Sequence, residues 1–113
     1  PEDMVAYWDF DAPGIPNEPR DASAAAVMAC AMYELSMYNP EKAALYKKWA
    51  DTIVESLSKN YRAQLDGDRG FLLLHSTGAH NFERDVPLVY ADYYFLEALL
   101  KKAKLEKEDT AIL

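Results

Sequence analysis

Apolar residues recur at helical spacing in three stretches of the chain. The first stretch runs from about Asp21 to Tyr38, and Asp21 can accept hydrogen bonds from the free amides of the Ala-Ser-Ala-Ala-Ala run that follows. Asn39-Pro40 ends it, because the residue before a proline is disfavoured in a helix. Its apolar residues surround the helix axis and leave no polar face. A helix of this kind is buried on all sides, so we expect complete burial.

The second stretch has one polar face. Its pattern begins at Asn39-Pro40, where proline at the first helical position loses no hydrogen bond, and continues to about Asn60. Charged residues occupy most positions between the apolar ones. The pattern predicts a helix with one buried and one solvated face. The apolar residues of the buried face are Leu45, Trp49, Ala50, Ile53, Val54 and Leu57.

The third stretch begins near Asp85 to Pro87 and continues through Lys104. Like the first, it is apolar around its axis, interrupted by Asp92 and Glu97. Asp92 needs a partner in such surroundings, for which an arginine or a free amide at a helix end is expected. We expect residues 101–113 to form a charged, frayed tail.

The order of buried helix, one-sided helix and buried helix does not suit a closed domain of 113 residues. A small domain has too much surface to hold two wholly internal helices, so other helices must cover them. Two concentric layers explain the alternation, because inner helices are covered by outer ones and by each other. An all-α toroid or solenoid therefore fits better than a free-standing three-helix bundle. No repeat of about 30 to 45 residues is evident, which disfavours the solenoid.

Composition and net charge limit the classes of partner that the chain can bind. The chain is 50% hydrophobic, which is typical of one small globular domain, and its net charge of -7 argues against nucleic acid and anionic membranes as partners. Its sequence contains no apolar run long enough to span a membrane and no export signal at the N-terminus. Cys30 lies in an apolar run and is expected to be a small buried hydrophobe. The chain begins at Pro1 without Met, as a piece of a longer protein would.

Residues 1–20 form a loop rich in proline and aromatic residues, which suggests a packed loop. Tyr7 and Trp8 could stack on a sugar ring or fill a core. Asp9 and Asp11 stand two residues apart and could form an acid/base pair. We favour a structural role for both, in which they accept hydrogen bonds from backbone amides and pair with Arg20.

A second loop follows the extended run Phe71 to Leu74, in the segment FLLLHSTGAHN. Gly78 can take a positive φ and bring backbone amides close to a ligand. Ser76, Thr77 and those amides could then bind sugar hydroxyls, a carboxylate or sulfate, or they could make internal bonds alone. His75 is either a donor to substrate or a structural histidine. A metal site built from Asp9, Asp11, His75 and His80 has no recognisable ligand spacing, so none is predicted.

Tyr90, Tyr93 and Tyr94 share one face of the third stretch by helical spacing. On an inner helix they could direct polar tips toward the axis of a toroid. The alternative is that they are buried tyrosines bonded to their neighbours.

Three motifs, YWDFDAPGIPNEPRDASAAA, GFLLLHSTG and DVPLVYADYYFLEALL, resemble in their order the C-terminal part of unsaturated glucuronyl hydrolases, glycoside hydrolase family 88. The resemblance implies an (α/α)6 toroid of which this chain supplies roughly the last quarter to third. It also implies an activity on oligosaccharides left by polysaccharide lyases, which end in an unsaturated uronic acid. In that family an aspartate donates a proton to the double bond and helps water add to it, after which the sugar opens and releases the remaining chain.

The family's catalytic aspartates lie upstream of the segments matched here, so no catalytic residue is assigned and this chain alone is expected to be inactive. The residues predicted to bind substrate are Tyr7, Trp8, His75, Ser76, Gly78 and Tyr93. The implied partners are an unsaturated uronic-acid oligosaccharide and either the missing N-terminal part of the toroid or another copy of the chain, with no cofactor. The family's sulfate-binding members carry further Ser or Lys residues after the glycine that corresponds to Gly78, whereas this sequence has Ala79, His80 and Asn81. The preference for a sulfated sugar therefore stays open. The location also stays open between the bacterial cytoplasm and periplasm. The alternative function is a non-catalytic helical module that binds carbohydrate or protein.

Overall fold

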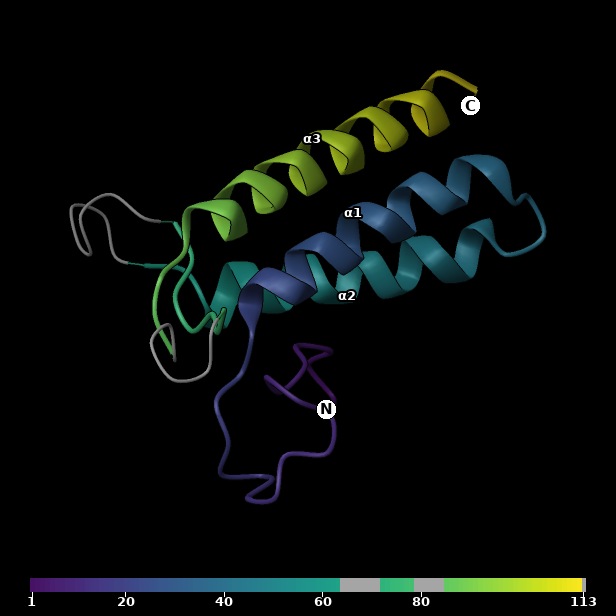
Figure 1. Ribbon diagram of the computed structural model, residues 1–113. Helices are drawn as coiled ribbons and strands as arrows, with labels where there is room; N and C mark the ends of the chain where they lie inside the picture. The colour runs from purple at the N-terminus through teal and green to yellow at the C-terminus, as the bar shows by residue number, and fades with distance from the viewer. Residues whose placement is uncertain (64–71, 79–84, 113) are drawn as a thin grey trace.

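The protein is built from three long helices. The computed structural model describes residues 1–63, 72–78 and 85–112, with residues 108–112 described by their backbone alone. The helices are α1 (Ala22–Tyr38), α2 (Ala43–Asn60) and α3 (Val89–Ile112). In Figure 1, α1 lies between the other two, and α1 and α3 run in one direction while α2 returns. The described ranges contain isolated β-bridges and no β-strand, so the all-α prediction is confirmed.

Helix α1 begins where its cap predicts. The Asp21 carboxylate accepts a hydrogen bond from the Ser23 amide at 3.1 Å and satisfies one of the free donors of the first turn. Small residues dominate the buried side, which lets both neighbouring helices approach closely. The buried residues are Ala22, Ser23, Ala25, Ala26, Ala29, Cys30, Tyr33 and Ser36.

Helix α2 begins later than predicted. Residues 40–42 form a turn, and the helix begins at Ala43. Asn39 accepts two hydrogen bonds from the Lys42 amide, one at its carbonyl (3.2 Å) and one at its side chain (3.3 Å), so it closes this turn and does not cap the helix. The one-sided pattern is confirmed for Ala50, Ile53, Val54 and Leu57, which are buried. The predicted burial of Leu45 and Trp49 is wrong, because they lie in the first turns of α2 and are 42% and 36% exposed.

Helix α3 ends later than predicted, because the segment expected to fray is helical through Ile112. Leu105 is buried in the core shared by the three helices. Lys101 lies 3.4 Å from Glu34 of α1, and Lys102 lies 3.1 Å from Asp51 of α2. Burial and ion pairs together hold this turn of the helix against its neighbours. No helix in the described ranges is long and apolar enough to cross a membrane.

One face of α1 and one face of α3 remain uncovered, so the complete burial expected of both helices is not reached within this chain. Leu35 on α1 is 46% exposed and Leu100 on α3 is 72% exposed. The exposed apolar residues recur at helical spacing, and each helix therefore carries a continuous stripe. We call them the α1 stripe (Ala24, Val27, Met28, Ala31, Leu35 and Tyr38) and the α3 stripe (Val89, Tyr93, Leu96 and Leu100).

Two buried polar groups of α1 bond to the neighbouring helices. The Tyr33 hydroxyl donates to Asp51 of α2 at 2.5 Å, and burial followed by this carboxylate raises the pKa of Tyr33 well above its usual range. The Cys30 thiol donates to the carbonyl of Tyr94 on α3 at 2.9 Å. Burial, assisted by Glu97, raises the pKa of Cys30 to about 11. The prediction that Cys30 is buried is confirmed.

Candidate functional site

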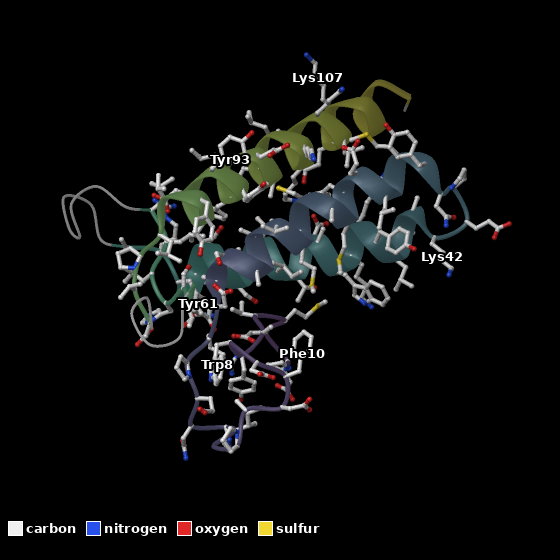
Figure 2. The ribbon with its side chains drawn as sticks, in the orientation of Figure 1. Trp8, Phe10, Lys42, Tyr61, Tyr93 and Lys107 are labelled. Atoms are coloured by element: carbon white, nitrogen blue, oxygen red, sulfur yellow. The ribbon has the colours of Figure 1, made fainter. Side chains whose placement is uncertain are left out.

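Two loops meet at the beginning of α1. The first, the aromatic loop (residues 1–20), doubles back on itself through a bridge between Tyr7 and Arg20. The Trp8 amide donates to the Pro19 carbonyl, and the Asp21 amide donates to the Ala6 carbonyl, both at 2.9 Å. Figure 2 shows Trp8 and Phe10 in this loop, to one side of the helices. The second, the His75 loop (residues 72–78), leads toward α3.

Arg20 anchors the aromatic loop, but its partner is not the predicted one. Its guanidinium donates to the Asp3 carboxylate at 2.9 Å and to the Val5 carbonyl at 2.7 Å, and it lies 4.3 Å from the centroid of the Tyr7 ring. Asp3 lies nearer because the loop folds its first residues back against Arg20. The predicted pairing with Asp9 and Asp11 is therefore wrong.

The predicted bonding of these aspartates to backbone amides is confirmed for Asp9. Its carboxylate accepts a hydrogen bond from the Asp11 amide at 2.9 Å. Both residues are exposed.

Asp3 also joins the aromatic loop to the end of α2. The Tyr61 hydroxyl donates to the second carboxylate oxygen of Asp3 at 2.7 Å. Burial opposes ionisation of Asp3, but hydrogen bonds from Tyr61, Val5 and Arg20 outweigh it and lower the pKa of Asp3. Burial and the bond to Asp3 raise the pKa of Tyr61 to about 12. The pair therefore holds an ionised carboxylate against a neutral phenol at neutral pH.

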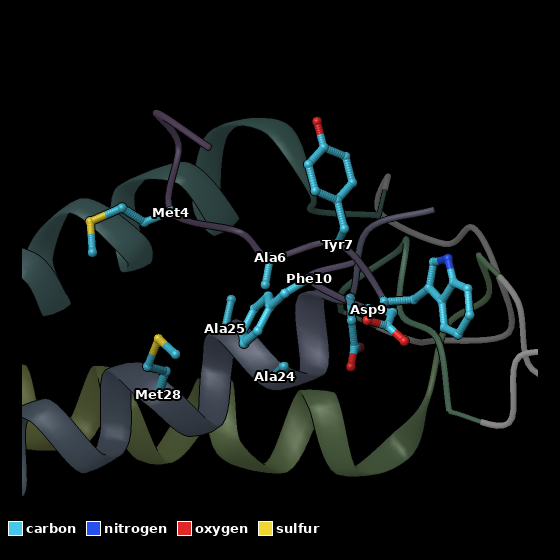
Figure 3. Close-up of a pocket in the computed structure, with 10 residues that line it drawn as sticks. Met4, Ala6, Tyr7, Asp9, Phe10, Ala24, Ala25 and Met28 are labelled. Atoms are coloured by element: carbon cyan, nitrogen blue, oxygen red, sulfur yellow. The ribbon is translucent and has the colours of Figure 1, made fainter. Parts of the chain in front are cut away.

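A cavity of about 290 Å³ lies between the aromatic loop and α1. Figure 3 shows the Phe10 ring beside Ala25 at its wall, while the Tyr7 ring points away from α1. The lining is mostly apolar: Met4, Ala6, Tyr7, Trp8, Asp9, Phe10, Asp21, Ala24, Ala25 and Met28. Such a wall can take the apolar face of a sugar ring, and the two aspartates in it can accept hydrogen bonds from hydroxyls.

Backbone amides of the His75 loop are already bonded within the protein. Leu72 and Leu73 donate to the Asp92 carboxylate, each at 3.0 Å, and Leu74 donates to the Tyr61 carbonyl at 2.7 Å. The prediction that Asp92 has a partner is confirmed, although the amides come from a loop and not from a helix end. These amides precede the turn whose amides were predicted to face a ligand. In that turn the Ser76 amide donates to the Val86 carbonyl and the Thr77 amide to Asp21, so these two donors are occupied within the protein.

His75 has a positive φ of 64°, a conformation that non-glycine residues rarely adopt. Its carbonyl accepts from the first amide of α1, that of Ala22, at 3.0 Å. Its ring lies 2.6 Å from the Asp85 carboxylate and packs edge-on against Tyr61. His75 thus lines a polar cavity of about 400 Å³ with Asp3, Glu18, Pro19, Arg20, Asn60, Tyr61 and Asp85.

Ser76 lies inside the loop. Its amide and carbonyl bond to Val86 at 2.9 and 2.8 Å, and its side chain is completely buried. Within the described ranges its hydroxyl has no hydrogen-bond partner. Gly78 is exposed at the end of the loop, and its positive φ stays a prediction. Ala79, His80 and Asn81 lie outside the described residues.

Tyr93 lies apart from both cavities. It is 62% exposed on α3 and packs edge-to-face on Tyr94, with ring centroids 5.0 Å apart. Figure 2 shows Tyr93 on α3, on the opposite side of the helices from Trp8 and Phe10. The fold therefore brings Tyr7 and Trp8 together at one cavity and His75 to the adjoining one, but does not join Tyr93 to either. That these residues bind substrate stays a prediction.

Sequence reasoning did not assign Phe10, Met4 or Met28 to the site, although all three line the apolar cavity. Phe10 was detectable, because it belongs to the same aromatic cluster as Tyr7 and Trp8. The methionines were not, since nothing local shows that residue 4 and residue 28 meet. In the described part of the chain, no three His, Cys, Asp or Glu side chains are grouped as a metal site would require.

Known proteins similar to this chain are unsaturated glucuronyl hydrolases. One from Formosa agariphila is 45% identical over 93% of this chain, and one from Bacillus sp. strain GL1 is 36% identical over 89%. A crystal structure of an unsaturated glucuronyl hydrolase specific for heparin matches 95% of this chain with a TM-score of 0.90 and 44% identity. The Bacillus structure matches with a TM-score of 0.81. No family model matches the chain.

The chain spans 26% and 28% of the two curated relatives and 29% of the heparin-specific structure. The resemblance stated from the three motifs is therefore confirmed, and so is the expected fold, since these structures are helical toroids. A related structure, a mutant of the Streptococcus agalactiae enzyme, is complexed with dGlcA-GalNAc6S.

Proposed function

We propose that this chain is one segment of a glycosidase that removes an unsaturated uronic acid from the non-reducing end of lyase-generated oligosaccharides. The observation that carries the proposal is the 45% identity to an unsaturated glucuronyl hydrolase over nearly all of the chain. The exposed apolar stripes of α1 and α3 support it, because in a toroid they would be covered by further helices. The rest of the toroid lies in polypeptide outside this segment.

In this proposal the apolar cavity is part of the sugar-binding wall. Tyr7, Trp8 and Phe10 offer the aromatic surface on which a pyranose ring packs. His75 and Gly78, which are exposed, form the rim of the neighbouring subsite. Ser76 supports this rim from inside the loop through its backbone bonds to Val86.

The acid that protonates the double bond is supplied from outside this segment. A general acid needs a proton to give and access to the reacting carbon. Three aspartates around the two loops are engaged otherwise: Asp3 binds Arg20 and Tyr61, Asp21 caps α1, and Asp92 binds two amides. These carboxylates build the wall and hold its loops.

The experiment compares two proteins, the isolated chain and the longer gene product that contains it. Each is incubated with an unsaturated disaccharide released by a lyase, and the absorbance of the C4=C5 double bond is followed. We expect loss of absorbance with the longer protein and none above buffer with the chain. A folded longer protein that binds the disaccharide without consuming it would favour the non-catalytic binding module. Turnover by the chain alone would place the acid here, with Asp9 and Asp11 the first candidates.

A further inference from the structure

Thr77 connects the two loops of the site. Its side chain is buried, so it does not itself reach a ligand. Its hydroxyl donates to the Arg20 carbonyl at 3.1 Å and accepts from the Asp85 amide at 3.3 Å. Its amide donates to the Asp21 carboxylate at 3.1 Å. One residue of the His75 loop is thus bonded to the end of the aromatic loop and to the residue that begins the next turn toward α3.

One carboxylate oxygen of Asp21 accepts three hydrogen bonds. The oxygen that accepts from Thr77 also accepts from the amide and the hydroxyl of Ser23 in α1. Asp21 lines the apolar cavity, and Arg20 lines the polar one. The bonds from Thr77 to Arg20 and Asp21 therefore join the His75 loop to one lining residue of each cavity.

We propose that Thr77 is a positioning residue that sets substrate affinity by holding the His75 loop in register with the aromatic loop. The inference rests on the proposed function, because it assumes that a sugar spans the two cavities. Without the Thr77 hydroxyl, the Arg20 carbonyl and the Asp85 amide each lose a partner. The His75 loop then keeps its bonds to the start of α1 from the Thr77 amide to Asp21 and from the Ala22 amide to the His75 carbonyl, but loses its side-chain bond to the aromatic loop. His75 then moves away from the wall formed by the aromatic loop. Substrate contacts weaken equally in the ground and transition states, because the proton transfer occurs elsewhere.

The test uses the longer gene product and measures kcat and KM on an unsaturated disaccharide for Thr77→Val and Thr77→Ser. We expect Thr77→Val, which keeps the shape and removes the hydroxyl, to raise KM about three- to tenfold with little change in kcat. Thr77→Ser restores the hydroxyl and should return KM to within about twofold of the wild type. Ser23→Ala is the matched control, because it removes a hydrogen bond to the same Asp21 oxygen and leaves Thr77 in place.

The control should lower the melting temperature and leave KM unchanged. A Thr77→Val enzyme with a lower melting temperature and an unchanged KM would overturn the inference, since Thr77 would then serve stability alone. An equal rise of KM in Ser23→Ala would overturn it as well, because the effect would belong to the helix cap. Absence of wild-type turnover would instead refute the proposed function, so the two failures are distinguishable.

Discussion

The solvent-exposed surface of α2 differs in polarity from those of α1 and α3. Outside its buried face, α2 carries mostly polar and charged residues, with pairs such as Glu55 and Lys59, and its exposed large apolar residues are Leu45 and Trp49 in the first turns. Helix α1 and the first half of α3, through Leu100, are apolar both where they meet their neighbours and along a stripe that meets solvent. Leu100, 72% exposed, and Phe95, 2% exposed, stand on opposite sides of α3. The chain thus buries most of the apolar face of α2 by itself and leaves an apolar stripe of α1 and of α3 exposed to solvent.

In the proposed function, the exposed apolar stripes are the surface of a segment and not of a finished domain. A monomeric protein seldom exposes a contiguous apolar patch of more than a few hundred Å². The similarity to helical toroids of which the chain spans about a quarter gives the reason. On this account α2 is an outer helix and α1 and α3 are inner ones.

The largest expected effect tests the packing that the chain completes by itself. Phe95 is buried among α1, α2 and α3. Phe95→Ala should lower the free energy of unfolding by about 3–5 kcal/mol, because it removes buried surface and leaves a cavity. Urea unfolding of the isolated chain measures this. A loss below about 1 kcal/mol would show that α3 is not docked as described.

Truncating a residue of the α3 stripe should have different effects on stability in the isolated chain and in the longer protein. In the isolated chain Leu100→Ala should change the unfolding free energy by less than about 0.5 kcal/mol, as exposed positions usually do. In the longer protein the same change should cost about 2–5 kcal/mol, because Leu100 is then buried. Equal small effects in both proteins, measured by urea unfolding, would mean that the stripe stays uncovered.

A smaller effect is expected at the contact between α1 and α2. Tyr33→Phe removes the hydrogen bond to Asp51 and should cost about 1–2 kcal/mol near neutral pH. Folding raises the pKa of Tyr33, so the unfolded tyrosine releases its proton first, at about pH 10. Its contribution is therefore complete below about pH 10 and is lost as the pH rises above it.

The difference in unfolding free energy between wild type and Tyr33→Phe should accordingly be smaller at about pH 11 than at about pH 8. Tyr61 titrates in both proteins and cancels in the comparison. A gap that widens with pH would contradict the assignment of the neutral phenol as donor to Asp51.

The smallest effect is expected on the solvated face of α2. Glu55 pairs with Lys59 at 2.5 Å, but both side chains are mostly exposed. Exposed pairs of this kind contribute little. Glu55→Gln should leave the urea midpoint unchanged in the isolated chain and in the longer protein alike. A clear loss in the longer protein alone would show that α2 is covered there, and would remove the distinction between outer and inner helices.

Local chemistry predicts much of this fold. The cap at Asp21, the one-sided pattern of α2 and the need of Asp92 for a partner all follow from residues close in sequence. The end of α3 does not, because Leu105 becomes buried only through contacts with distant residues. The pairing of Arg20 with Asp3 also depends on how the aromatic loop folds back, which no local pattern determines.

The candidate site shows the same division. The aromatic cluster and the HisSerThrGly turn are recognisable in the sequence, and the structure places them side by side at the start of α1. Which donors are already occupied is a property of the whole chain. Asp92 binds two amides of the His75 loop from 19 and 20 residues away, and Asp21 binds the Thr77 amide from 56 residues away.

Thiol accessibility at Leu100 tests most directly whether the inner helices are completed by further polypeptide. Leu100→Cys is combined with Cys30→Ala, and the reaction with a thiol reagent is timed at low protein concentration in the isolated chain and in the longer protein. Glu55→Cys on α2 is the matched control and should react rapidly in both. If further polypeptide covers α3, the cysteine at position 100 is labelled rapidly in the isolated chain and is strongly protected in the longer protein. Equally rapid labelling in the two proteins would contradict this coverage.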